Sequence, residues 1–147
     1  MERTTPQKRR IGAASVEFRP VVLEPLSRSD DSLLVRSFQE QVLPALTPIA
    51  LDHAHPLPGL PAGSIGVVVR FRRPSEHRIG VVLVPPLLPQ SLTVHGREHS
   101  MTVRVEHAIA RYVSVLFTTL PVERCWSFRV TRNGEPAQVR VVIRNVA

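Results

Sequence analysis

The chain has little of what cross-links a protein or anchors it in a membrane. Its 147 residues include one cysteine, Cys125, and one lysine, Lys8, and the aromatic residues are five Phe, one Trp and one Tyr. One cysteine excludes an internal disulfide, and because no export signal is visible we expect a cytoplasmic protein. No apolar run approaches the roughly 20 residues that span a bilayer, so no membrane contact is expected.

Positive charge is what the sequence has in excess. The formal net charge is +7, and 18 of the 19 basic residues are arginine. Arginine binds phosphate and carboxylate with paired hydrogen bonds, so an arginine-rich surface favours polyanions as partners. A GC-rich genome also replaces lysine by arginine through codon usage, and that explanation stays open. The positive field favours anionic partners under either explanation.

The chain divides into a basic flexible tail, residues 1–14, and one domain over residues 15–147. A short edge strand is expected at residues 16–23, and a helix begins after Ser29 and ends at Pro44. The next expected elements are a hairpin from residues 65–72 and 78–84 and a short strand at 91–94. A helix capped by Thr102 is expected at 102–116. The last expected element is a hairpin from 125–132 and 137–145 around Asn133-Gly134.

Paired strands joined by short loops, with only two helices, indicate an α+β fold: a mainly antiparallel sheet with two helices on one side. In the last hairpin, Trp126, Phe128 and Val130 alternate with Arg129. Because side chains alternate along a strand, one face of this hairpin is expected to be core and the other cationic.

Residues 46–61, LTPIALDHAHPLPGLP, place His53 and His55 beside Asp52 among four prolines. Such a group could bind a metal, but only three ligands are local, and the prolines favour a rigid structural corner. We assign the corner to Pro48, Asp52, His55 and Pro56 and expect no metal ligand, cofactor site or catalytic residue. His77, His95 and His99 are expected in solvated loops, and Cys125 is expected to be a buried structural cysteine.

Four segments in order resemble the second, or head, domain of the polyphosphate kinases of the first type. They are FQEQVLPALTPIALDHAHPLPGL, VVLVPPLLPQSLTV, FRVTRN and VRVVIRN. Gln90 stands where that family usually has arginine, and GEPAQ replaces a long inserted helix. The resemblance covers residues 16–147. It implies contacts between copies of this domain, and therefore a homodimer.

No counterpart of the family's first domain or of its two C-terminal domains, which carry the phosphorylated histidine, is visible in this sequence. We therefore expect a chain that is not an enzyme. The expected function is a non-catalytic module that binds polyphosphate or another polyanion, or associates with itself or with a full-length kinase.

The expected anion-binding residues are six arginines on the two hairpins: Arg70, Arg72, Arg129, Arg132, Arg140 and Arg144. Arg70 and Arg72 share one face of the first hairpin, and adjacent cationic faces would form a groove for a phosphate chain. Each arginine could instead be a solvated sheet residue. A nucleic-acid-binding protein is an alternative that few aromatic residues support, and a relic fragment without its own function is another.

Overall fold

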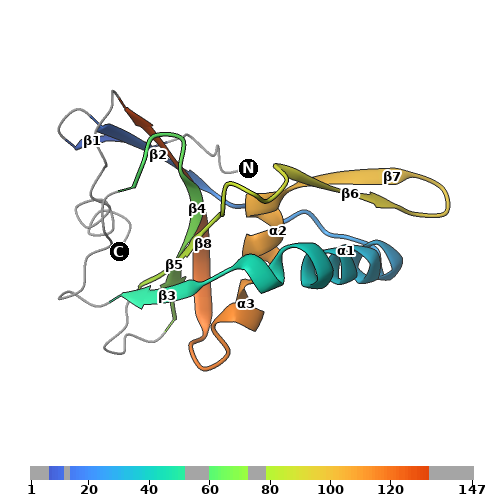
Figure 1. The fold of residues 1–147 in the computed structure, drawn as a ribbon. Coiled ribbons are helices and arrows are strands. Elements are labelled where there is room, and N and C mark those ends of the chain that lie inside the picture. The colour runs from blue at the N-terminus through green and yellow to red at the C-terminus, as the bar shows by residue number, and fades with distance from the viewer. Residues whose placement is uncertain (1–6, 12–13, 52–59, 73–78, 133–147) are drawn as a thin grey trace.

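The protein combines a large antiparallel sheet, a small hairpin and three short-to-medium helices on one side of the large sheet (Figure 1). This computed structural model describes residues 7–11, 14–51, 60–72 and 79–132. The elements are β1 (Gln7–Ile11), β2 (Ala14–Pro20), α1 (Arg28–Gln41), η1 (Leu43–Ala45), β3 (Pro48–Leu51), β4 (Ile65–Phe71), β5 (Ile79–Leu83), β6 (Ser91–His95), β7 (Ser100–Arg104), α2 (Val105–Arg111), α3 (Val113–Leu116) and β8 (Val122–Arg132). The α+β class is confirmed, although the described residues form three α-helices where two were expected.

The large sheet has the strand order β1-β2-β8-β4-β5-β3, and every pairing in it is antiparallel. The expected hairpin of β4 and β5 is confirmed, with Val68 opposite Val81. β2 is not the edge strand that the sequence predicted, because Gln7–Ile11 form β1 and pair with its free side. These basic residues therefore belong to the sheet. The division of the chain at residue 14 stays a prediction.

Helix α1 follows the predicted amphipathic pattern with a different start. Its N-cap is Ser27, whose Oγ accepts a hydrogen bond from the Asp30 amide at 3.2 Å, and not Ser29. Leu34 and Phe38, one turn apart, are buried. The helix ends at Gln41, and η1 carries the chain to β3. No helix in the described part of the chain is long and apolar enough to cross a membrane.

The second predicted helix begins three residues later than expected. Residues 100–104 form β7, in which Thr102 lies opposite Thr93 of β6, and α2 begins at Val105 without a side-chain cap. The β-favouring run Met101-Thr102-Val103 explains the strand, because its alternate residues pack partly against the core. A break at Tyr112 then separates α2 from α3.

The core has two parts, one on each face of the large sheet. Leu34, Phe38 and Ile109 pack with Val67 and Val69 on the helix side, whereas Val68 packs with Phe18, Phe128 and Val130 on the opposite side. Because Val67, Val68 and Val69 are all fully buried, β4 is covered on both faces. The continuous apolar sequence of this strand is typical of such two-sided burial.

Candidate functional site

The clearest positive cluster lies where β4 ends beside β8. Arg70 and Arg124 are directly opposite each other in the antiparallel pairing. Side chains at directly opposite positions are about 5 Å apart at Cβ, and like charges there oppose strand pairing. The arrangement therefore requires neighbouring groups that reduce the repulsion.

Two neighbours of this pair supply that compensation. The Arg70 Nε donates a hydrogen bond to Glu123 Oε2 at 2.9 Å, and the guanidiniums of Arg70 and Arg124 each lie 5.4 Å from the centre of the Trp126 ring. Cation–π contacts of this kind contribute about 0.5–1 kcal/mol each at exposed positions. The pair is therefore tolerated, but its charge is not cancelled.

A β-bulge makes this cluster. Arg70 lies opposite Arg124 while Phe71 lies opposite Val122, so Glu123 is the extra residue of β8. A bulge re-aims the side chains beside it, and here the Glu123 carboxylate lies 2.9 Å from the Arg70 Nε.

Arg72 lies just beyond β4, where its amide donates to the Pro121 carbonyl at 2.7 Å, and it is exposed. Phe71 is buried on the helix side, whereas Arg70 contacts Trp126 on the opposite side, and the predicted shared face of Arg70 and Arg72 stays a prediction for Arg72. We call Arg70, Arg72, Glu123, Arg124 and Trp126 the β4–β8 arginine site. Sequence reasoning missed Arg124 because the sequence shows no signal for the bulge.

Arg129 lies elsewhere on β8. It is opposite Glu17 of β2 and Ile65 of β4, on the helix side of the sheet, whereas Trp126 and Phe128 face the other side. It lies five residue steps along β8 from Arg124, which is about 17 Å. Arg70 and Arg129 therefore do not line one groove, and the expected wholly cationic face includes Glu17.

The remaining predicted positions are only partly described. Arg132 is the last residue of β8, paired with Ala14, and Pro48 is the first residue of β3. Arg140, Arg144, Asp52, His55 and Pro56 lie outside the described residues, as do His53 and His77. The roles of these residues stay predictions.

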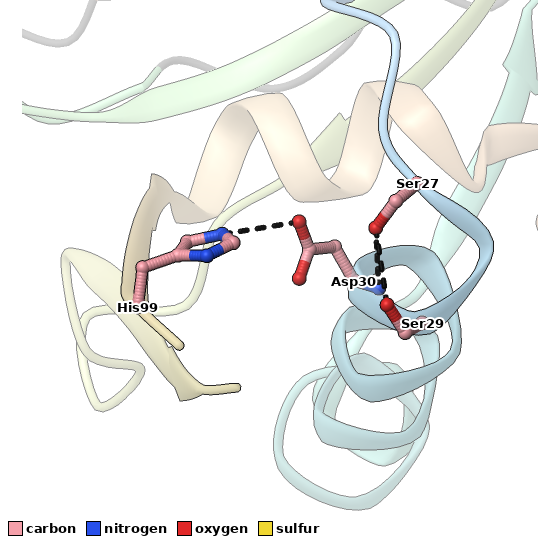
Figure 2. A network of polar contacts seen from close by, with 4 residues as sticks. All are labelled: Ser27, Ser29, Asp30 and His99. Carbon is pink, nitrogen blue, oxygen red and sulfur yellow. Dashed lines mark hydrogen bonds and ion pairs between the residues drawn. The ribbon is translucent and has the colours of Figure 1, made fainter. Parts of the chain in front are cut away.

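Two histidines that were expected to be solvated have side-chain partners. His99 Nε2 lies 3.2 Å from Asp30 Oδ2, and His95 Nδ1 lies 2.9 Å from Ser100 Oγ. Figure 2 shows the His99 ring, at the β6–β7 hairpin, pointing toward Asp30 at the start of α1, where Ser27 caps the helix. The His99 contact fastens the hairpin to α1, whereas the His95 contact joins the two strands of the hairpin.

Other reactive groups are sparse in the described part of the chain. Among residues 7–11, 14–51, 60–72 and 79–132, no three His, Cys, Asp or Glu side chains gather as they would around a metal ion. Cys125 is half-buried, and burial raises the pKa of its thiol to about 11. A thiol with this pKa is a poor nucleophile near neutral pH.

The chain matches known proteins over most of its length. Residues 29–138 match the family described as polyphosphate kinase middle domain. The polyphosphate kinase of Staphylococcus haemolyticus is 32% identical over 121 residues, covering 81% of this chain and 17% of the relative. The polyphosphate kinase of Erythrobacter litoralis is 35% identical over 102 residues, covering 69% of this chain and 14% of the relative.

A solved structure shows the same fold. The crystal structure of polyphosphate kinase from Porphyromonas gingivalis superposes with a TM-score of 0.59 at 21% sequence identity, covering 71% of this chain and 17% of that one. At this identity the likeness concerns the fold alone.

The expectation that the chain is not an enzyme is overturned by these relatives, because they are named as polyphosphate kinase, which is an enzyme. The chain spans about 17% of the length of the first of them. The activity of the whole relative is therefore not assigned to this segment. Because the family match covers residues 29–138 and these relatives are more than 30% identical, the chain belongs to the polyphosphate kinase middle-domain family.

Proposed function

We propose that this middle domain binds polyphosphate through the β4–β8 arginine site, as part of a polyphosphate kinase. The observation that carries the proposal is the direct opposition of Arg70 and Arg124 across two strands. The site contains the three guanidiniums of Arg70, Arg72 and Arg124 and one carboxylate, that of Glu123, which pairs with Arg70, so the site keeps an excess of positive charge. A phosphate group between the two arginines would relieve their repulsion.

The hydrogen-bonding capacity of the site supports this. Glu123 engages Nε of Arg70, which leaves the terminal nitrogens of that guanidinium for a ligand. Arg124 is exposed and has no ion pair with any residue that the structure describes; its contact is with the Trp126 ring. Guanidinium forks of this kind bind phosphate oxygens in pairs, and successive phosphates of a chain could contact Arg70, Arg124 and Arg72 in turn.

The test is equilibrium binding of long-chain polyphosphate at several salt concentrations. Each phosphate contact releases counterions, so affinity should fall linearly on logarithmic axes, and the double variant Arg70→Gln/Arg124→Gln should lower the slope by roughly one to two units. Arg36→Gln is the matched control, because Arg36 is an exposed arginine on α1, paired with Glu40. Unchanged binding by the double variant would show that polyphosphate does not use this site.

A competition experiment separates polyphosphate from nucleic acid. At about 0.15 M salt, single-stranded DNA of equal charge should compete weakly, because general single-strand binding relies on exposed aromatic platforms. Trp126, the one tryptophan, is half-buried and already carries two guanidiniums. Equal competition by DNA would favour a nucleic-acid-binding role.

A second candidate function is association with another copy or with a full-length kinase. β3 is the last strand in the sheet order, and among the described strands it pairs only with β5. A free strand edge is a template for pairing with another chain. We expect a dimer by light scattering at micromolar concentration, and a strict monomer at millimolar concentration would leave only the full-length kinase as partner.

A further inference from the structure

A cavity opens beside the start of β4 and the end of β5, at the other end of β4 from the β4–β8 arginine site, and its lining comes from both faces of the sheet. Its volume is about 690 Å³, and it lies between the start of β3, the end of β5, the linker that follows β5, and the β7–α2 junction. A smaller hollow of about 230 Å³ adjoins it. Both hollows are lined by Ile65, Arg104, Glu106 and Arg129, so these four residues stand at their shared boundary.

The larger cavity has apolar walls on a stiff frame. Val84 and Leu88, which pack against the helix-side core, contribute aliphatic surface, as do Ile49, Leu60 and Leu83, which pack with the core on the other face. Four prolines also line the cavity: Pro61, Pro85, Pro86 and Pro89. Because proline fixes its own φ angle, the walls keep their shape without a ligand. Small-molecule sites are typically preformed, mostly apolar and about 300–1,000 Å³ in volume, and this cavity lies within that range.

Glu106 gives the cavity a polar end. Only 7% of its surface is exposed, and it is the one buried charged residue in the described part of the chain. Its nearest cation is Arg104, whose Nη1 lies 3.6 Å from Oε1, and the described residues donate no hydrogen bond to the carboxylate. A buried carboxylate without donors is costly, so this group can still accept a hydrogen bond from a ligand.

Arg129 supplies an available cation at the same end. Its guanidinium has no hydrogen bond or ion pair with another described residue, although Glu17 is opposite it in the sheet. Glu17 is occupied by Arg19, whose Nη2 lies 2.7 Å from its carboxylate. An exposed guanidinium therefore lies close to a buried carboxylate at the mouth of an apolar cavity.

We propose that this cavity binds a small amphipathic molecule. Its apolar body would lie against Ile65, Val84 and Leu88, its anionic group would lie on Arg129, and an adjacent N–H or O–H would donate to Glu106. This site is separate from the polyphosphate site, because Arg129 and Arg70 lie on opposite faces of the sheet. The ligand is a compact molecule with one anionic end and not a polyanion.

Two fluorescent probes that differ in one group test the proposal. 8-Anilinonaphthalene-1-sulfonate carries an aromatic body, a sulfonate and an N–H, whereas N-phenyl-1-naphthylamine has the same body and N–H without the anion. We expect saturable one-site binding of the sulfonate probe, at least about tenfold tighter than the neutral probe, since one anion–guanidinium contact typically accounts for that factor. Equal affinities would overturn the assignment of Arg129 as the anion contact.

Variants locate the probe. Arg129→Gln should weaken the sulfonate probe about tenfold and leave the neutral probe unchanged, and Arg36→Gln should change neither. Ala62→Trp, at an exposed position on the cavity rim, should abolish binding of both probes while polyphosphate binding persists. Ala45→Trp, at another exposed lining position, provides a second block if circular dichroism shows that Ala62→Trp is unfolded. Probe binding that survives a folded blocking variant would show that the cavity holds no ligand.

Discussion

The Tyr112 hydroxyl donates a hydrogen bond to Asp31 Oδ1 at 2.8 Å and joins the break between α2 and α3 to the first turn of α1. The Tyr112 ring also packs against Phe38, with ring centroids 5.2 Å apart. Burial raises the pKa of Tyr112 above its ordinary value, and the hydrogen bond to Asp31 and the charge of Asp31 act in the same direction.

Tyr112→Phe should lower the free energy of unfolding by about 1–2 kcal/mol, because it removes a hydrogen bond to a charged acceptor. The measurement is urea denaturation at pH 7. The pH dependence gives a second check. A tyrosine in the unfolded chain ionises near pH 10, whereas Tyr112 in the folded chain stays protonated to higher pH. The stability that Tyr112 contributes is therefore complete below about pH 10 and is lost as the pH rises above it.

The free energy of unfolding of the wild type should fall above about pH 10 partly because Tyr112 ionises in the unfolded chain. Tyr112→Phe should lack that part of the decrease. The assignment is simple because the chain has one tyrosine. An identical loss of stability above pH 10 in Tyr112→Phe would contradict the assignment.

Gly80 lies under the contact that holds α3 to the sheet. A Cβ at this position would come within 2.6 Å of Phe117 Cζ and 2.9 Å of Phe71 Cζ, and these two rings form an edge-to-face pair at 5.2 Å. Gly80→Ala should cost about 1–3 kcal/mol of stability, as overpacking of a close-packed core does.

A double-variant cycle in urea denaturation checks the cause. In a Phe117→Leu background the smaller side chain makes room, so Gly80→Ala should cost less there than in the wild type. An equal cost in both backgrounds would point to backbone strain and away from the ring contact.

Cys125 should react slowly with thiol reagents. Burial raises the pKa of its thiol to about 11, so the thiolate fraction at pH 8 is on the order of 100-fold below that of a free cysteine. We expect the rate with iodoacetamide to increase about tenfold for each pH unit up to pH 10, since the thiolate is the reacting form. The control is the urea-unfolded chain, which should react at the rate of a free cysteine. A fast, pH-independent reaction in the folded chain would show that the thiol is not buried in solution.

The sequence predicted the fold best where hydrophobic pattern and burial agree. The β-branched run around Val68 was predicted to be a strand of a hairpin, which β4 is, and Leu34 and Phe38 mark the buried stripe of α1. The start of α2 was misplaced because Val105 continues both the alternation of β7 and the four-residue spacing of the helix. Residues 100–104 form a strand because Thr102 pairs with Thr93 of β6, and a single sequence does not reveal that pairing.

The candidate sites were less predictable because they depend on register. Arg70 and Arg129 were expected to line one groove, but the strand pairing places them on opposite faces of the sheet. Arg124 was missed because the pairing beside it contains a bulge at Glu123, and no residue type in the sequence predicts that bulge. Glu106 appeared to be an ordinary acid of a first helical turn, and only the fold buries it beside a cavity.

Trp126 should report the binding of polyphosphate directly. It is the only tryptophan, and both guanidiniums of the opposed arginine pair lie 5.4 Å from its ring. A phosphate chain that draws Arg70 and Arg124 toward itself must change the charge above the ring. We therefore expect a saturable change in tryptophan emission with long-chain polyphosphate, with the same midpoint as the binding isotherm and reversal by added salt, since the contacts are electrostatic.

The double variant Arg70→Gln/Arg124→Gln should lose this signal while keeping the wild-type melting temperature to within a few degrees, because the pair is exposed or half-buried and contributes little to the core. N-Acetyltryptophanamide is the control for nonspecific effects of polyphosphate on emission. If polyphosphate binds with unchanged emission, it occupies a surface away from Trp126, and Arg129 on the opposite face becomes the first position to test. A double variant that keeps both binding and the emission change would instead show that the ring responds to the ligand without these two arginines, and the opposed pair would then be a feature of the sheet alone.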